Sequence, residues 1–182
     1  MTGPRLILVN GPPATGKSTL AHRYAAERPL TLNLDIDRVR DLIGGWAAQP
    51  GPAGLLAREI ALSAARVHLL AGHDVIVPQL LARPRFLLEA ESLASSLNVP
   101  FHEVALLDTK ENCLRRFATR AATRAATRAG TRAGTPISDI SEIEALYDGF
   151  LALIATRPRT RRVASREGDV EGTYRALLES LA

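Results

Sequence analysis

The sequence predicts one α/β domain, in which a five-stranded parallel sheet has helices on both faces. Short apolar stretches with many β-branched residues, such as 5–10 and 100–107, have the length and composition of buried strands. Longer segments between them, such as 53–71, carry apolar residues at helical spacing. Alternating strands and helices are typical of a parallel sheet, because each connection must cross back over the sheet.

Five apolar stretches are the expected strands: 5–10, 30–34, 74–78, 100–107 and 160–165. Pro29 separates the second strand from the preceding helix, and an acidic segment that begins at Asp35 follows it. The third strand ends at Pro78, so Gln79 is expected just beyond it.

The helices are expected at 18–28, 53–71, 84–97, from residue 109 onward, at 138–157 and at 169–181. Gly72 ends the second helix, Pro84 opens the third, and Asp169 is expected to cap the last. Residues 44–52 contain several Gly and Pro residues, so we expect a flexible connection there.

Length and composition favour a single domain over residues 1–182. A chain of 182 residues with 46% hydrophobic residues can build one full core. The N-terminus lacks the pattern of a signal peptide and no apolar run reaches membrane length, so we expect a cytoplasmic protein. Cys113 is the only cysteine, which excludes an internal disulfide and a multi-cysteine metal site, and its place in an amphipathic segment favours a core thiol.

The net charge of +4 comes mainly from arginine, because Lys17 and Lys110 are the only lysines. An arginine excess can mark nucleic-acid binding. Against that, only 4% of the residues are aromatic and no stacking motif is present. The excess fits a site for a polyanionic nucleotide equally well.

The segment 11–18 matches the phosphate-binding pattern GxxxxGK[ST], with Gly11, Gly16, Lys17 and Ser18 at the fixed positions. Backbone N–H groups can surround a phosphate where no side chain blocks them, and the following helix adds its positive N-terminus. Lys17 can reach the terminal phosphates, and the Ser18 hydroxyl is placed to ligate Mg²⁺. The sequence thus predicts binding of a nucleoside triphosphate with Mg²⁺, through Gly11, Pro13, Ala14, Thr15, Gly16, Lys17, Ser18 and Thr19.

Polar residues follow the second and third expected strands, at the edge where open parallel sheets bind ligands. Asp37 is the better candidate to accept or orient the proton of an attacking hydroxyl. Asp35 either helps to hold Mg²⁺ through water or caps the next helix. The remaining candidates for contact with an acceptor are Arg40, Trp46 and Gln79. Arg40 could equally be a solvated helix residue. Trp46 could stack on an acceptor or cover a core edge.

A row of arginines recurs every four residues after the fourth strand: Arg116, Arg120, Arg124, Arg128 and Arg132. This spacing keeps the guanidinium groups on one slowly rotating helix face, where like charges repel and a bound polyanion relieves them. We therefore interpret 116–136 as a lid over the triphosphate, with Arg116 and Arg120 as the first candidates for phosphate contact. The alternative, a solvated low-complexity helix or loop, is equally supported for Arg124 and Arg128 and favoured for Arg132.

In this order of elements the chain resembles the small P-loop kinases, in particular the group that includes chloramphenicol phosphotransferase, zeta toxin and related small-molecule kinases. At lower resolution it is similar to gluconate and shikimate kinases. The resemblance implies a P-loop NTPase fold and an ATP-dependent transfer to a hydroxyl, with Asp37 as the base and Arg116 and Arg120 on the phosphates. By topology, residues 165–169 after the fifth strand are expected to border the base of the nucleotide.

Two function hypotheses follow. The first is a kinase that phosphorylates a hydroxyl of a small molecule, such as an antibiotic, a nucleoside or a sugar-like metabolite. The second is an NTPase switch, or a nucleic-acid-associated NTPase whose arginine row grips a polyanion. Pro78 and Gln79 stand where such an NTPase would carry an acidic residue, which argues against the second hypothesis. The sequence does not separate ATP from GTP.

Overall fold

In the computed structural model, which describes residues 3–127 and 140–182, all strands belong to one parallel sheet. Its five strands have the order β2-β3-β1-β4-β5. They are β1 (Leu6–Asn10), β2 (Leu32–Asn33), β3 (Val75–Gln79), β4 (Phe101–Leu107) and β5 (Arg161–Ala164). The predicted α/β class and the all-parallel sheet are confirmed.

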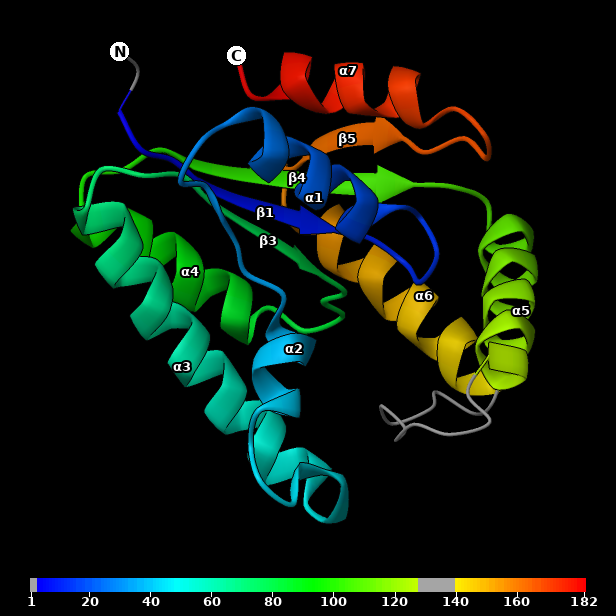
Figure 1. The fold of residues 1–182 in the computed structure, drawn as a ribbon. Helices are drawn as coiled ribbons and strands as arrows, with labels where there is room; N and C mark the ends of the chain where they lie inside the picture. Colours follow the sequence, from blue (N-terminus) through cyan, green and yellow to red (C-terminus); the bar gives the residue numbers. More distant parts are fainter. Residues whose placement is uncertain (1–2, 128–139) are drawn as a thin grey trace.

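Helices cover both faces of the sheet (Figure 1). They are α1 (Lys17–Glu27), α2 (Ile36–Asp41), the short 3₁₀ helix η1 (Trp46–Ala48), α3 (Pro50–Leu70), α4 (Arg85–Ser96), α5 (Lys110–Thr127), α6 (Ile140–Ala155) and α7 (Val170–Ser180). Helices α1 and α7 lie on one face, and α3, α4 and α6 lie on the other. The helix α5 extends beyond the carboxyl end of β4.

Successive side chains of β1 point to opposite faces and so belong to two different cores. Ile7 and Val9 pack with residues of α1 and α7, whereas Leu6 and Leu8 pack with residues of α3 and α4. All four side chains are buried. A strand buried on both faces needs a continuous apolar run, which is why β1 can be recognised in the sequence.

The segment 44–52 contains more helical structure than the connection that its composition predicts. Trp46–Ala48 forms a turn of 3₁₀ helix, and α3 already begins at Pro50. Proline is tolerated in the first turn of a helix, because the N–H that it lacks would have no intrahelical partner there. The prolines that suggested a loop therefore start the helix.

The helix α3 also buries an unexpected face. Its core-facing residues are Ala53, Ala57, Ala61, Ala65 and Leu69. Most of the large apolar side chains at helical spacing, namely Leu55, Leu56, Ile60, Val67 and Leu70, are 42–70% exposed. Small alanines let α3 lie close to α4, and the sequence pattern alone does not show which of two apolar stripes is used.

The strand β2 is shorter than the predicted 30–34, because Leu30 has a φ of 63°. This left-handed conformation is incompatible with an extended strand. The predicted burial of Cys113 is confirmed, and burial raises the pKa of its thiol to about 11. None of the helices in the described parts of the chain is long and apolar enough to cross a membrane.

A buried ionic group ties α4, β4 and the segment before β5 together. The side chain of Glu103 on β4 is only 4% exposed, and its carboxylate accepts hydrogen bonds from Arg157 Nε at 2.9 Å and from the Thr160 hydroxyl at 2.8 Å. Arg157 also donates to Glu91 at 2.8 Å. A buried carboxylate requires such partners, because burial removes its hydration.

We expect Arg157→Met to lower the free energy of unfolding by about 3 kcal/mol, because the buried Glu103 loses its counter-ion. Urea denaturation measures this change. The matched control is Arg85→Met, since Arg85 pairs with Glu89 on the surface and its side chain is 74% exposed. This control should leave the midpoint nearly unchanged. Equal losses of unfolding free energy in the two variants would show that the buried pair stabilises the fold no more than the surface pair does.

Candidate functional site: the phosphate loop and its surroundings

The loop between β1 and α1 has the backbone conformation that the sequence motif requires. Ala14 has a φ of 63° and Gly16 a φ of 85°, both in the left-handed region. Gly16 is the N-cap residue of α1 and has no side chain to occupy the first turn. The N–H groups at the start of α1 are therefore open to an anion, and the helix dipole favours negative charge there.

Close packing holds this loop against the sheet. A Cβ atom on Gly11 would lie 2.9 Å from the carbonyl oxygen of Leu106 and 3.0 Å from Thr15 Oγ1, so only glycine fits. The neighbouring Asn10 is fully buried, and its Oδ1 accepts from the N–H groups of Gly11 and Leu81, both at 2.8 Å. Asn10 thus links the start of the loop to the segment after β3, a role that the sequence analysis did not find.

The Lys17 ammonium group lies over the same loop. Its Nζ donates to the carbonyl oxygens of Gly11 and Pro12, each at 2.7 Å. The positive charge is therefore held within the loop. Ser18 and Thr19, the next residues of α1, are exposed at the start of the helix.

The two predicted carboxylates have different environments. Asp35 is the N-cap residue of α2, and its Oδ1 accepts from the Asp37 N–H at 3.0 Å. Asp37 lies in the first turn of α2, with 60% of its side-chain surface exposed. Neighbouring protein atoms nevertheless remove part of its hydration and raise the pKa of its carboxyl, while the charges of Arg40 and Lys17 act in the opposite direction. Lys17 is therefore within electrostatic reach of Asp37.

Arg40 is held in place and is not a solvated helix residue. Its guanidinium donates to Asp37 Oδ1 at 3.0 Å and to Asp41 Oδ1 at 3.3 Å. It also lies 4.3 Å from the ring centroid of Trp46, so one face of the indole is covered by a cation. Arg40 joins the candidate base to the 3₁₀ turn that follows.

Gln79 is the last residue of β3 and is paired in register with Asn10. It therefore lies beside the start of the phosphate loop. Its Oε1 is buried and accepts no hydrogen bond from the described residues. A buried acceptor of this kind is costly without a partner, which makes Gln79 suited to a polar ligand.

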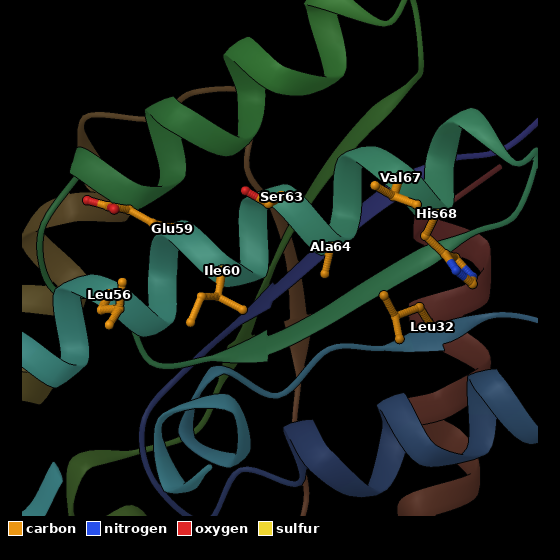
Figure 2. Close-up of a pocket in the computed structure, with 8 residues that line it drawn as sticks. All are labelled: Leu32, Leu56, Glu59, Ile60, Ser63, Ala64, Val67 and His68. Atoms are coloured by element: carbon orange, nitrogen blue, oxygen red, sulfur yellow. The ribbon is translucent and has the colours of Figure 1, made fainter. Parts of the chain in front are cut away.

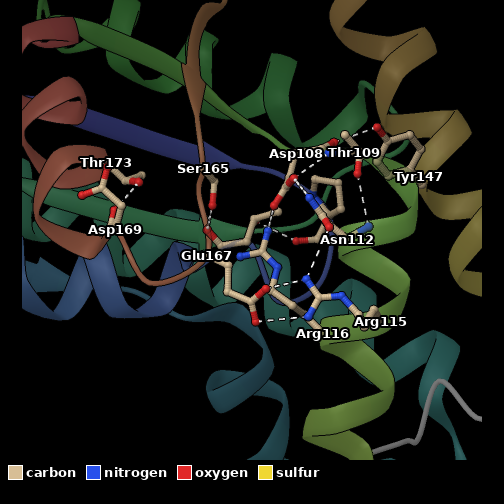
Figure 3. A network of polar contacts seen from close by, with 12 residues as sticks. Asp108, Thr109, Asn112, Arg115, Arg116, Tyr147, Ser165, Glu167, Asp169 and Thr173 are labelled. Carbon is tan, nitrogen blue, oxygen red and sulfur yellow. Dashed lines mark hydrogen bonds and ion pairs between the residues drawn. The ribbon is translucent and has the colours of Figure 1, made fainter.

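On the other side of the loop, a cavity of about 170 Å³ separates the start of α1 from the segment after β5. Thr15, Gly16 and Thr19 line it, as do residues 165–170 and Thr173. The Ser165 hydroxyl donates to the Thr15 carbonyl oxygen at 2.9 Å (Figure 3). The segment that the topology placed next to the base of a nucleotide thus borders a cavity beside the loop.

Arg116 of α5 also lines this cavity. Its guanidinium contacts the carboxylate of Asp108, the residue after β4 (Figure 3). The neighbouring Arg115 pairs with Glu167 from the segment after β5, and this hydrogen bond lowers the pKa of Glu167. Asp108 and Arg115 were missed by the sequence analysis, although Asp108 follows a parallel strand just as Asp35 does.

The rest of the predicted arginine row is not placed by the structure. Arg120 and Arg124 belong to α5, but their side chains lie outside the described residues. Arg128, Arg132 and the rest of the expected lid segment after residue 127 also fall outside them. Their predicted contact with phosphate stays a prediction.

A larger hollow lies elsewhere, along α3 beside β2 (Figure 2). It measures about 700 Å³ and is lined mainly by apolar side chains, among them Leu32, Leu56, Ile60 and Val67. This hollow is wide open and lacks a group of converging polar atoms, which ligand sites usually have. We therefore assign the site to the loop and not to this hollow.

The fold and the loop together define a P-loop protein with an all-parallel α/β sheet. Residues 6–135 match a family described as an AAA domain, and the chain belongs to this family. None of the curated proteins matches the chain.

Solved structures with a similar fold include several kinases. A "putative kinase" from Chloroflexus aurantiacus is 18% identical, with a TM-score of 0.70 over 100% of this chain and 97% of that one. A tunicamycin resistance protein from Deinococcus radiodurans is 17% identical, with a TM-score of 0.59 over 97% and 93%. A gluconokinase from Sinorhizobium meliloti is 18% identical, with a TM-score of 0.56 over 98% and 92%. At such identities the likeness concerns the fold.

We expect Gly11→Ala to weaken the binding of a fluorescent ATP analogue at least about tenfold, equal to about 1.4 kcal/mol. The added methyl group would meet the backbone oxygen of Leu106 and displace the loop. A fluorescence titration measures the dissociation constant. The matched control is Gly44→Ala, because nothing lies within 4 Å of its added Cβ. Unchanged binding in Gly11→Ala would mean that the loop does not hold the nucleotide.

Proposed function

We propose that this chain is a kinase that transfers the γ-phosphoryl group of ATP to a hydroxyl of a small molecule. The triphosphate lies on the loop 11–18, and the nucleoside lies in the cavity bordered by residues 165–170. The acceptor lies on the other side, next to Asp37, Arg40 and Gln79. The family and the folds of the similar kinases support this proposal.

One observation carries the proposal: the candidate base Asp37 follows β2 and the phosphate loop follows β1, so both lie at the carboxyl edge of one parallel sheet. A kinase needs a proton acceptor near the terminal phosphate, because the acceptor hydroxyl has to attack in line with the leaving oxygen. The candidate phosphate site and the candidate acceptor site therefore share one edge of the sheet.

In this mechanism the acceptor oxygen forms a bond to the γ-phosphorus, while the bond to the bridging β–γ oxygen breaks and its electron pair stays on ADP. The Asp37 carboxylate takes the hydroxyl proton. Arg40 holds this carboxylate through the 3.0 Å hydrogen bond, and Lys17, with Arg116 or Arg120, stabilises the charge on the transferred group.

The Ser18 hydroxyl, exposed at the start of α1, is the group that would hold Mg²⁺. Within the described chain, no cluster of three or more His, Cys, Asp or Glu side chains could hold a metal by itself. This fits Mg²⁺, which takes one or two protein oxygens and completes its shell with phosphates and water. The ion supplies charge neutralisation of the β- and γ-phosphates.

The alternative, an NTPase that grips nucleic acid, gains no support from the described part of α5. Arg115 pairs with Glu167 at the surface, and Arg116 is largely buried beside the nucleotide cavity, so neither presents an unpaired cation on the surface to an external polyanion. A transfer screen with [γ-³²P]ATP over antibiotics, nucleosides and sugars, with a control that lacks acceptor, tests the proposal. Hydrolysis that depends on RNA or DNA, without transfer to any small molecule, would favour the alternative.

We expect Asp37→Asn to retain ATP binding and to lose at least about 10²-fold in transfer rate, because the amide cannot take the proton. The Asp35→Asn variant separates the two carboxylates. Asparagine is an equally good N-cap residue, so this variant should keep both the helix α2 and the activity. Loss of transfer in Asp35→Asn with normal turnover in Asp37→Asn would reverse the assignment of the base.

The pH profile provides a further test. The base must be deprotonated, so kcat/KM falls as the pH drops through the pKa of Asp37, and this acid limb should lie above the ordinary value of 3.8. Arg40→Gln removes the cation that lowers this pKa, so the limb should move to higher pH. A limb that stays in place in Arg40→Gln would exclude Asp37 as its origin.

A further inference from the structure

We propose that Asp108 is a positioning residue, which holds the guanidinium of Arg116 at the nucleotide cavity before ATP binds. This inference rests on the proposed kinase function. It assigns to the carboxyl end of β4 a role that neither the motif nor the fold defines.

Asp108 directly follows β4, the strand that pairs with β1 on the side opposite β3. The carbonyl oxygen of Leu106, two residues earlier, is the atom that a Cβ on Gly11 would meet at 2.9 Å. The main chain that leads to Asp108 is therefore in van der Waals contact with the phosphate loop. The side chain of Asp108 therefore starts from a backbone position that is fixed relative to that loop.

The carboxylate itself is oriented by two hydrogen bonds, and a third holds the backbone of the same residue (Figure 3). Its Oδ1 accepts from the Thr109 N–H at 2.7 Å and from Asn112 Nδ2 at 2.9 Å. The Tyr147 hydroxyl of α6 donates to the Asp108 carbonyl oxygen at 2.9 Å. Thr109 and Asn112 thus occupy Oδ1 and leave Oδ2 to Arg116.

Arg116 lies between this carboxylate and the cavity. The side chains of Asp108 and Arg116 are only 7% and 12% exposed, so the pair is largely withdrawn from water. The same arginine lines the cavity together with Thr15 and Gly16 of the loop. A buried guanidinium needs a counter-ion, and Asp108 supplies it.

The consequence for phosphoryl transfer is preorganisation. An arginine side chain has many rotamers, and a group that is already in position loses less freedom when the transition state forms. Without the Asp108 charge, Arg116 is expected to leave its place beside the cavity. The cost should appear in the rate more than in nucleotide affinity, because the arginine stabilises charge that spreads in the transition state.

The ion pair at the start of α5 does not share this arrangement. Lys110 pairs with Asp148 of α6 at 3.0 Å, and the Asp148 side chain is 63% exposed. This pair also ties α5 to the rest of the molecule, but it does not line the cavity. Asp148→Asn is therefore a matched control for the removal of one carboxylate charge next to α5.

The experiment combines Asp108→Asn and Arg116→Ala, singly and together, in a double-mutant cycle. The rate of [γ-³²P]ATP hydrolysis, with Mg²⁺ present and water as the acceptor, is measured under single-turnover conditions. The dissociation constant of a fluorescent ATP analogue and the melting temperature are measured for each variant. Asp108→Asn keeps the Oδ1 acceptor for Thr109 and Asn112 and removes only the charge.

We expect Asp108→Asn to lower the rate by about 10- to 100-fold and to change the dissociation constant by less than about threefold. In the Arg116→Ala background the same change should have no further effect, because Asp108 acts through Arg116. Asp148→Asn should match the wild type. Equal losses in both backgrounds, or no loss in Asp108→Asn, would overturn the positioning role.

A second variant serves if Asp108→Asn does not fold. Asn112→Ala removes one hydrogen-bond donor to the Asp108 carboxylate, so we expect a smaller loss of hydrolysis rate than in Asp108→Asn. This loss should vanish in the Arg116→Ala background, and a loss that persists there overturns the positioning role.

The wild-type measurements separate the positioning role from the kinase function. A wild type that neither binds the analogue nor hydrolyses ATP refutes the kinase function itself, whereas normal turnover in Asp108→Asn refutes only the positioning role.

Discussion

The close contact between the phosphate loop and β4 is the constraint on which the rest of the site depends. Gly11 lies so near the Leu106 carbonyl oxygen that no side chain fits between them. Asn10, the residue before it, is buried and hydrogen-bonded to the segment after β3. The loop is thus held from both neighbouring strands, and its N–H groups keep one orientation without a ligand to shape them.

This constraint also decides which residues meet at the loop. The register of β1 with β3 places Gln79 opposite Asn10, and β4 carries Asp108 to the other side. Asp37 and Arg40 belong to α2, which is short and is fixed by the Asp35 cap. In the proposed mechanism the loop itself separates the acceptor side, with Asp37 and Arg40, from the nucleotide side, with Arg116. A phosphoryl group bound on the loop would lie between them.

Much of the fold could be predicted, because buried parallel strands have a continuous apolar run that is rare elsewhere. The loop was predicted from four fixed residues, since their backbone requirements are local. The pairing of Arg116 with Asp108 could not be predicted. The two residues are eight positions apart and meet only because β4 ends where α5 begins. The buried face of α3 was misjudged for a related reason, since both an alanine stripe and a leucine-rich stripe have helical spacing.

The sequence by itself determined the strands, the phosphate loop and the presence of a carboxylate after the second strand, because each depends on residues that are close along the chain. Only the tertiary structure decided which side chains share the loop. It placed Gln79 beside Asn10 at the start of the loop, and it placed the end of β4 against Gly11. These contacts depend on strand register and helix packing, which bring together groups that are distant in the sequence.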